Sequence, residues 1–212
     1  MRFFLLFLAG TALAQRPSIG IKAGVPAADA FRAESWRYGR YHPDSGRYVI
    51  GPMFELRLPL RFSIEFDMLY RSVKYRTQSG GPTESSELVT TGDAWYFPLL
   101  AKVRLSASRV APYVAAGLSF ERLSGLRQVG TIITKLPSPD ERSVNTDRPE
   151  ELTRQSRYGY VLGVGLEGRL PVVRLAPEIR YTRWQQDSFL SPQTSSALSR
   201  LSQLEVLVGI AF

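Results

Sequence analysis

Apolar and polar residues alternate along runs of 11 to 16 residues, and this alternation limits the possible folds of the chain more than any other feature. In the run 61–70, Glu65 and Asp67 fall on one face and Phe66 falls on the other. A period of two residues indicates a β-strand, because successive side chains point to opposite sides of it. Ordinary strands have about 5–6 residues, whereas a strand that crosses a membrane needs about 9–11. The pattern therefore predicts an all-β fold with strands long enough to cross a membrane.

Eight such runs follow one another, and the links between them alternate between short and long. The predicted strands are 17–27, 47–58, 61–76, 93–106, 109–122, 157–170, 172–184 and 202–212. The long links are predicted to be loops, at 28–46, 77–92, 123–156 and 185–201. Tight turns on one side and long loops on the other are typical of outer-membrane barrels, whose even strand number places both termini in the periplasm. The sequence thus predicts a single eight-stranded antiparallel up-and-down transmembrane β-barrel over residues 15–212.

Four prolines fall inside the predicted strands, at Pro52, Pro98, Pro112 and Pro177. Proline has no N–H group to donate to a β-ladder, and a closed barrel has no free edge where this loss is harmless. We therefore expect each of them to mark a β-bulge or a local break.

The first 14 residues have the layout of a secretory signal peptide. Arg2 is followed by an apolar segment, 3–8, and by the small-residue cleavage pattern Ala12-Leu13-Ala14. A transmembrane anchor, the alternative, would need about 20 apolar residues. No later stretch reaches that length, and the chain has no cysteine. Export without disulfides favours a Gram-negative envelope over a eukaryotic secretory route.

Alternation alone does not tell a membrane barrel from a soluble calycin-like binder, because the two are inside-out versions of each other. Three features favour the membrane barrel. Aromatic residues gather near the ends of the apolar face, as in interfacial girdles: Tyr70, Trp95, Phe97, Phe120, Tyr158, Tyr160 and Tyr181 at one end, Phe62 and Phe212 at the other. Glycines on the polar face of 157–169, among them Gly163 and Gly165, leave room for long side chains that cross a narrow lumen. The chain also ends in an aromatic residue that follows an alternating run.

The formal charge of +8 and the pI near 10 come from the strands, because the long loops are nearly neutral. Basic residues interleaved with acidic ones on an inward face argue against a nucleic-acid partner. The interior of an eight-stranded barrel is just wide enough to be filled by side chains, and buried charges require partners. We therefore predict an ion-pair network that closes the lumen, with a narrow anion-preferring pore as the alternative. Its predicted members are Lys22, Glu55, Arg57, Glu65, Asp67, Arg71, Lys102, Arg104, Glu121, Glu167, Arg169, Arg174, Glu178, Arg180 and Glu205.

Candidates for catalysis or metal binding are few. A Ser/His/acid site would need His42, the single histidine, which falls in a predicted loop and is interpreted as solvated. The acidic residues of 140–151 are interleaved with arginines, which favours a self-neutralised loop over a calcium site. We expect a non-enzymatic protein without cofactor or metal, and a lipid-active barrel enzyme is the rival hypothesis.

Three cations fall at the outer ends of strands that run away from the periplasm: Lys74, Arg122 and Arg183. Each follows an aromatic residue of the apolar face. We predict that they contact anionic groups of the outer-leaflet lipid through charge-assisted hydrogen bonds. The alternative is ordinary snorkelling of long side chains at an interface.

The segments Tyr96-Phe97-Pro98-Leu99-Leu100-Ala101-Lys102 and Ala111-Pro112-Tyr113-Val114-Ala115-Ala116-Gly117 resemble those of small outer-membrane β-barrel domains of the OmpA-like, OmpX-like and PorT-like kind. The terminal strand, Leu204 to Phe212, resembles the signal read by the barrel assembly machinery. The resemblance covers the predicted mature chain. It implies a Gram-negative outer-membrane location, contact with membrane lipid, assembly through Phe212, and a role in envelope structure or surface interaction. We expect a monomer whose surface partner the resemblance does not name.

Overall fold

The computed structural model describes residues 16–135, 139–191 and 198–212. The expected signal peptide, 1–14, lies outside these residues. The strands are β1 (Arg16–Pro26), β2 (Glu34–Trp36), β3 (Gly39–Pro43), β4 (Val49–Arg57), β5 (Phe62–Asp67), β6 (Leu69–Gly80), β7 (Glu84–Arg104), β8 (Val110–Thr134), β9 (Asp140–Thr146), β10 (Ser156–Arg169), β11 (Arg174–Trp184) and β12 (Ser202–Ala211). Within the described ranges, no helix is long and apolar enough to span a membrane.

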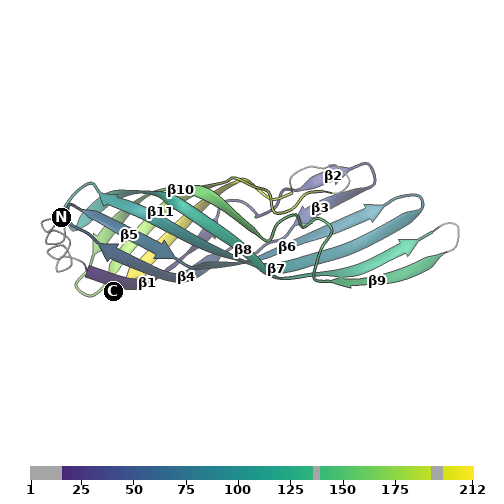
Figure 1. The fold of residues 1–212 in the computed structure, drawn as a ribbon, viewed down its shortest axis with the longest axis horizontal. Helices are drawn as coiled ribbons and strands as arrows, with labels where there is room; N and C mark the ends of the chain where they lie inside the picture. The colour runs from purple at the N-terminus through teal and green to yellow at the C-terminus, as the bar shows by residue number, and fades with distance from the viewer. Residues whose placement is uncertain (1–15, 136–138, 192–197) are drawn as a thin grey trace, which may run out of the picture.

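The strands form one antiparallel sheet that closes on itself where β1 pairs with β12 (Figure 1). The wall runs in the order β1, β4, β5 with β6, β7, β8, β10, β11 and β12. β5 and β6 are two parts of one strand, because both pair with β4 and with β7 in an unchanged register and are separated only by Met68. The wall therefore has eight strands, which confirms the predicted antiparallel up-and-down barrel.

Three of the four prolines lie at local breaks in strand pairing, and none of the three shifts the register of its strand. Met68 stands opposite Pro52, whose carbonyl accepts the Met68 N–H at 3.0 Å but whose ring nitrogen has no hydrogen atom to return. The break expected at Pro52 therefore lies in the neighbouring strand, at Met68 between β5 and β6.

Pro98 and Pro177 pair without a shift with β8 and β12 on one side. On the other side the pairs Asp67–Pro98 and Leu166–Pro177 are missing from the ladders, so a local break lies beside each of these two prolines, as expected. Pro112 pairs in register with β10, and the bulge or break expected there is wrong.

The barrel continues beyond its membrane-spanning part as a tall sheet, which corrects three of the predicted loops. β7 has 21 residues and β8 has 25, and most of the predicted loops 77–92 and 123–156 belong to β6, β7, β8 and β9. β2 and β3, in the predicted loop 28–46, join this sheet through β6. We call the part formed by β2, β3, β9, the residues 147–151 that follow β9, and residues 75–80, 84–91 and 126–134 the extension. It lies at the end of the molecule opposite the C-terminus (Figure 1).

A β-bulge separates the barrel from the extension. The register of β7 with β8 shifts between Thr91 and Asp93, opposite Gly125. Gly125 has a φ of +59°, a conformation that glycine adopts without the steric cost of a Cβ atom. A Cβ atom there would also stand 2.8 Å from the Asp93 carboxylate.

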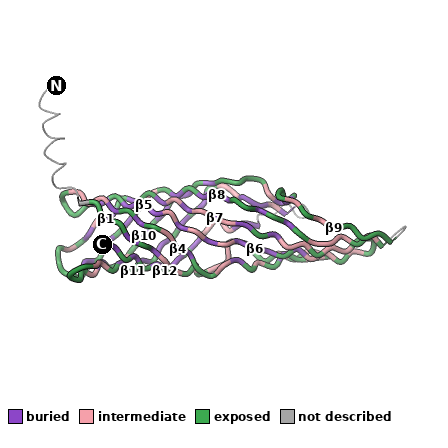
Figure 2. Tube along the Cα trace, turned by 90° about the horizontal axis from the view of Figure 1, so that it is seen from below, coloured by how far each residue is buried: buried purple, intermediate pink, exposed green. Residues whose placement is uncertain are grey.

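The barrel is polar inside and apolar outside. Ile19 and Leu162 are 61% and 60% exposed, whereas Lys22 and Asp67 are fully buried. Figure 2 shows the resulting alternation of buried and exposed residues along the barrel strands. Exposed apolar side chains around a closed sheet are the expected surface for contact with lipid.

Part of the expected aromatic girdle is visible as ring pairs on the outer surface. The rings of Tyr70 and Trp95 lie 5.2 Å apart, and those of Phe97 and Phe120 lie 6.4 Å apart. Tyr160 of β10 is 57% exposed on the same surface. These rings mark the level where the barrel leaves the apolar part of the membrane.

Candidate functional site

The middle of the lumen holds three cations and three carboxylates that project from four strands: Lys22, Glu65, Asp67, Lys102, Glu178 and Arg180. Arg180 lies 2.6 Å from Glu178, 2.9 Å from Asp67 and 3.2 Å from Glu65. Lys22 pairs with the same three carboxylates, at 3.3 Å from Asp67 and 3.2 Å from Glu178. These side chains are at most 2% exposed. Because each charge meets several opposite charges, this central cluster satisfies the condition for burying ions in a lumen.

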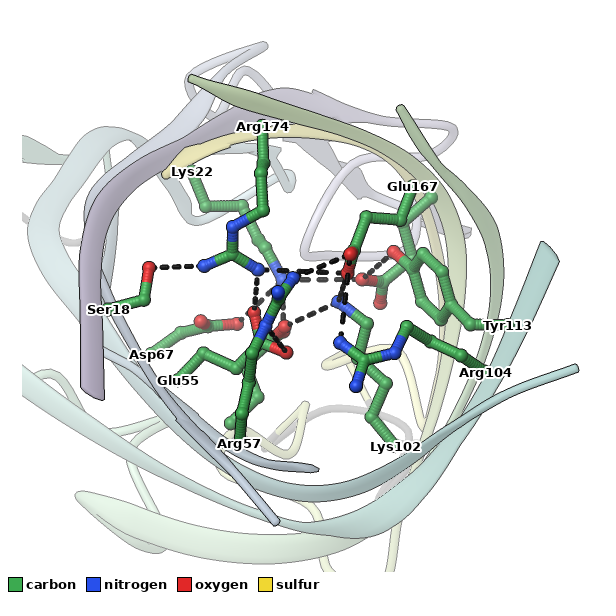
Figure 3. Close-up of polar contacts among 12 residues, drawn as sticks. Ser18, Lys22, Glu55, Arg57, Asp67, Lys102, Arg104, Tyr113, Glu167 and Arg174 are labelled. Carbon is green, nitrogen blue, oxygen red and sulfur yellow. Dashed lines mark hydrogen bonds and ion pairs between the residues drawn. The ribbon is translucent and has the colours of Figure 1, made fainter. Parts of the chain in front are cut away.

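A second cluster lies nearer the short turns, where Arg57, Arg104 and Arg174 surround Glu55 and Glu167 (Figure 3). Arg169 joins this cluster, at 3.4 Å from Glu167. Arg57 lies 2.6 Å from Glu167, and Arg174 lies 2.8 Å from Glu55. Lys102 connects the two clusters, at 3.2 Å from Glu65 and 4.0 Å from Glu167. Four arginines against two carboxylates leave this mouth with an excess of positive charge.

Three further members of the predicted network are buried in the lumen with different partners. Glu121 forms a two-pronged pair with Arg157, which also lies over the Trp184 ring at 4.7 Å. Arg71 donates to the backbone carbonyls of Gly46 and Ala28, at 2.9 and 3.3 Å. Glu205 accepts a hydrogen bond from Gln203 at 2.7 Å. Among the described residues, Arg71 and Glu205 have no ion pair, which departs from the expected set.

Two glycines of β10 provide the space that these side chains occupy. A Cβ atom on Gly163 would stand 2.7 Å from the Glu178 carboxylate, and one on Gly165 would stand 2.6 Å from the Tyr113 ring. Tyr113 in turn donates to Glu178 at 2.9 Å. Glycine on the inner face of this strand therefore lets Glu178 and its partners meet in the middle of the lumen.

An apolar plug, which the sequence reasoning missed, fills the lumen above the charged clusters. It combines wall residues with Phe31, Phe189 and Leu198 from the long links. The Phe31 ring lies 5.2 Å from that of Phe189 and 4.9 Å from that of Tyr75. A sequence signal existed, because in 72–75 the inward residues Val73 and Tyr75 are apolar while the outward residues Ser72 and Lys74 are polar.

The remaining candidates are dispersed. His42 is exposed on β3 rather than in a loop. Arg122 and Arg183 are exposed on the outer wall, where Arg183 donates to Ser202 at 2.7 Å, and Lys74 pairs with Asp44 at 3.2 Å. Among the described residues, no group of three or more His, Cys, Asp or Glu side chains is placed to hold a metal ion.

A closed eight-stranded barrel with an apolar outer band, aromatic girdle and ion-paired lumen defines a small outer-membrane β-barrel. A family comparison gives the same result: the family described as outer membrane protein beta-barrel domain matches residues 13–183. The chain belongs to this family, which confirms the resemblance seen in its sequence. It is therefore a protein of the Gram-negative outer membrane.

Several solved barrels are similar to the chain. The outer membrane protein OprG of Pseudomonas aeruginosa has 13% identity and a TM-score of 0.47, over 93% of this chain and 92% of that one. The Neisserial surface protein A has 14% identity and a TM-score of 0.40, with coverages of 93% and 97%. The N-terminal barrel domain of Pseudomonas aeruginosa OprF has 12% identity and a TM-score of 0.37, with coverages of 92% and 96%. No curated protein sequence matches the chain.

Proposed function

We propose that this protein is a non-enzymatic surface-interaction protein, in which a closed barrel anchors the extension outside the cell. The observation that carries the proposal is the length of β7 and β8, 21 and 25 residues, where about 9–11 suffice to cross a membrane. Long ordered strands beyond the bilayer hold a binding surface away from it. In barrels of this class the long connections face the exterior.

The filled lumen supports an anchoring role over transport. Ion pairs occupy its centre, and the apolar plug lies between them and the extension. A cavity beside Arg180 and Trp184 measures about 10 Å³, which is close to the space of one water molecule. The arginine-rich mouth is the one feature that favours the second candidate, an anion-preferring pore.

Protease treatment of intact cells tests the orientation. We expect external trypsin to cleave in the extension, after Arg76 or Arg142, because these side chains are exposed. Arg57 and Arg174, at the opposite mouth, serve as internal controls and should remain uncut. Cleavage of the extension only after the outer membrane is permeabilised would contradict the proposal.

Planar-bilayer recordings test the second candidate. The purified barrel is expected to give no discrete conductance steps, because charged and apolar side chains fill its lumen. Stepwise, anion-selective currents that disappear when Arg57 and Arg174 are replaced by Gln would instead establish the pore.

We also propose that Arg122, Arg183 and Lys74 contact anionic groups of the outer leaflet. Support comes from the outward exposure of both arginines at the level of the girdle. Replacing all three cations by Gln should reduce the anionic lipid that co-purifies with the protein. The matched control replaces three exposed arginines elsewhere, Arg32, Arg40 and Arg127, by Gln. Equal lipid content in both triple variants would rule out a specific contact.

A further inference from the structure

The extension contains a cleft whose floor carries a buried carboxylate without a cationic partner. The cleft measures about 420 Å³, within the range of small-ligand sites. Its floor includes Glu151, which follows β9 and is 5% exposed. Glu151 is fixed in place, because its carbonyl accepts from Leu190 at 2.9 Å and the neighbouring Leu152 bridges to Phe189.

The partners of the Glu151 carboxylate are neutral. Gln128 donates to it at 3.2 Å and to Thr90 at 3.0 Å. Among the described residues, no Lys, Arg or His forms an ion pair with Glu151, although every carboxylate of the two lumen clusters has one. Burial and the nearby Glu151 carboxylate raise the pKa of the Tyr41 hydroxyl above its usual range. An ionised carboxylate in such a place is unfavourable unless a positive charge neutralises it.

A second polar group in the cleft also lacks a partner. The Thr77 side chain is 5% exposed, and its hydroxyl oxygen has no hydrogen-bond partner within the described ranges. Buried hydroxyls are normally hydrogen-bonded, so an isolated one beside a cleft indicates a missing ligand atom. A primary ammonium group has three N–H donors and could satisfy the Thr77 hydroxyl and the Glu151 carboxylate together.

The walls above this floor match the stem of such a ligand. Apolar side chains from four strands line the cleft: Trp36, Leu88, Ile132 and Val144. The rim is close to neutral, with Arg142 and Arg148 against Glu84 and Glu150. Among the described residues that line the cleft, the deeply buried charge is therefore negative, and the path to it is apolar.

We propose that this cleft binds a primary ammonium group on a short alkyl stem, with Glu151 as the counter-ion and Thr77 as a second acceptor. The ammonium group can belong to a lysine side chain of a protein partner or to a free aliphatic diamine. The inference rests on the proposed role of the extension as an interaction surface and gives that surface a ligand chemistry.

Calorimetry on the full chain, folded in detergent micelles, provides the test. The probes are Nα-acetyl-lysine N-methylamide, 1,5-diaminopentane and the uncharged Nα-acetyl-norleucine N-methylamide. We expect at least one amine to bind and the norleucine compound not to bind. Tighter binding of the lysine compound indicates a protein partner, whereas tighter binding of the diamine indicates a free ligand. Amines that bind no better than norleucine would overturn the inference.

Variants locate the site. Glu151→Gln is expected to weaken amine binding at least tenfold, because it removes the counter-charge and preserves the shape. The matched control, Glu141→Gln, neutralises an exposed carboxylate of β9 that does not line the cleft and should change affinity less than twofold. Thr77→Val removes only the hydroxyl and should weaken amine binding severalfold. This second variant tests the site even if Glu151→Gln disturbs folding. Equal effects of Glu141→Gln and Glu151→Gln would show unspecific attraction and refute the site. Because these measurements use purified protein, their failure is distinct from a failure of the trypsin test on cells.

Discussion

Replacing Arg180 by Leu is expected to lower the free energy of unfolding of the barrel by about 3–5 kcal/mol, the usual cost of leaving buried charges without a partner. Arg180 is 1% exposed and pairs with Glu65, Asp67 and Glu178. Its loss leaves these three carboxylates to Lys22 and Lys102 alone. Urea unfolding in lipid vesicles, followed by tryptophan fluorescence and by heat-dependent gel mobility, measures the change.

Two further variants serve as a control for this prediction and as a test of charge balance in the central cluster. Arg127→Leu removes an exposed arginine of the extension and should change stability by less than about 1 kcal/mol, as expected for a surface ion or hydrogen-bond pair. Arg180→Leu combined with Glu178→Leu restores equal numbers of cations and carboxylates, and should recover part of the lost stability. A single variant as stable as Arg127→Leu would show that the central cluster does not hold the strands together.

The barrel itself was predictable because the membrane imposes a strict rule on each strand within it. Every outward position must be apolar and every inward position must fit a narrow polar lumen, so the alternation is strong wherever both demands act. Lys22, Glu65 and Arg180 could be assigned to the lumen for this reason. Gly163 could be assigned to the lumen with them, because glycine on the inner face leaves room for a long side chain. In the structure that side chain is Glu178.

Above the bilayer the same rule no longer acts, and this is where prediction failed. Outward positions of β7 such as Ser85 and Thr91 are polar, so the strand continues without the alternation that would reveal it. In 72–75 the pattern inverts, with Val73 and Tyr75 buried inside and Lys74 facing out. Such an inversion marks the level at which a strand leaves the membrane, and it is readable from sequence once this meaning is known.

The partners of Arg71 and the surroundings of Glu151 depend on how the long links fold back, which strand periodicity cannot describe. Arg71 shares the inward phase of Glu65 and Asp67, but at its level the lumen contains carbonyl groups of the link 27–48. Glu151 becomes buried because the segment that carries it bonds to residues of the link between β11 and β12. Both outcomes are set by contacts between segments far apart in the chain.

Replacing Phe189 by Ala is expected to open the link between β11 and β12 without unfolding the barrel. Phe189 is 1% exposed and packs edge-on against Phe31 and Tyr75, so truncation of its ring should cost about 3–5 kcal/mol. The cost falls on the local opening of this link, because the barrel strands are held by their own ladders. A loss of about 3 kcal/mol corresponds to roughly 100-fold faster proteolysis of the open form. The rate at which trypsin cleaves the folded protein after Arg200 measures this local opening.

Tyr38→Ala serves as the matched control, because Tyr38 lies in the same half of the molecule but is 45% exposed. Its removal should leave cleavage after Arg200 unchanged. The unfolding midpoint of Phe189→Ala should stay close to that of the unsubstituted protein, since ion pairs and strand ladders remain intact. A fall in the midpoint together with cleavage throughout the strands would show that the plug and the barrel unfold as one unit. Cleavage no faster than in Tyr38→Ala would show that the plug does not restrain the link.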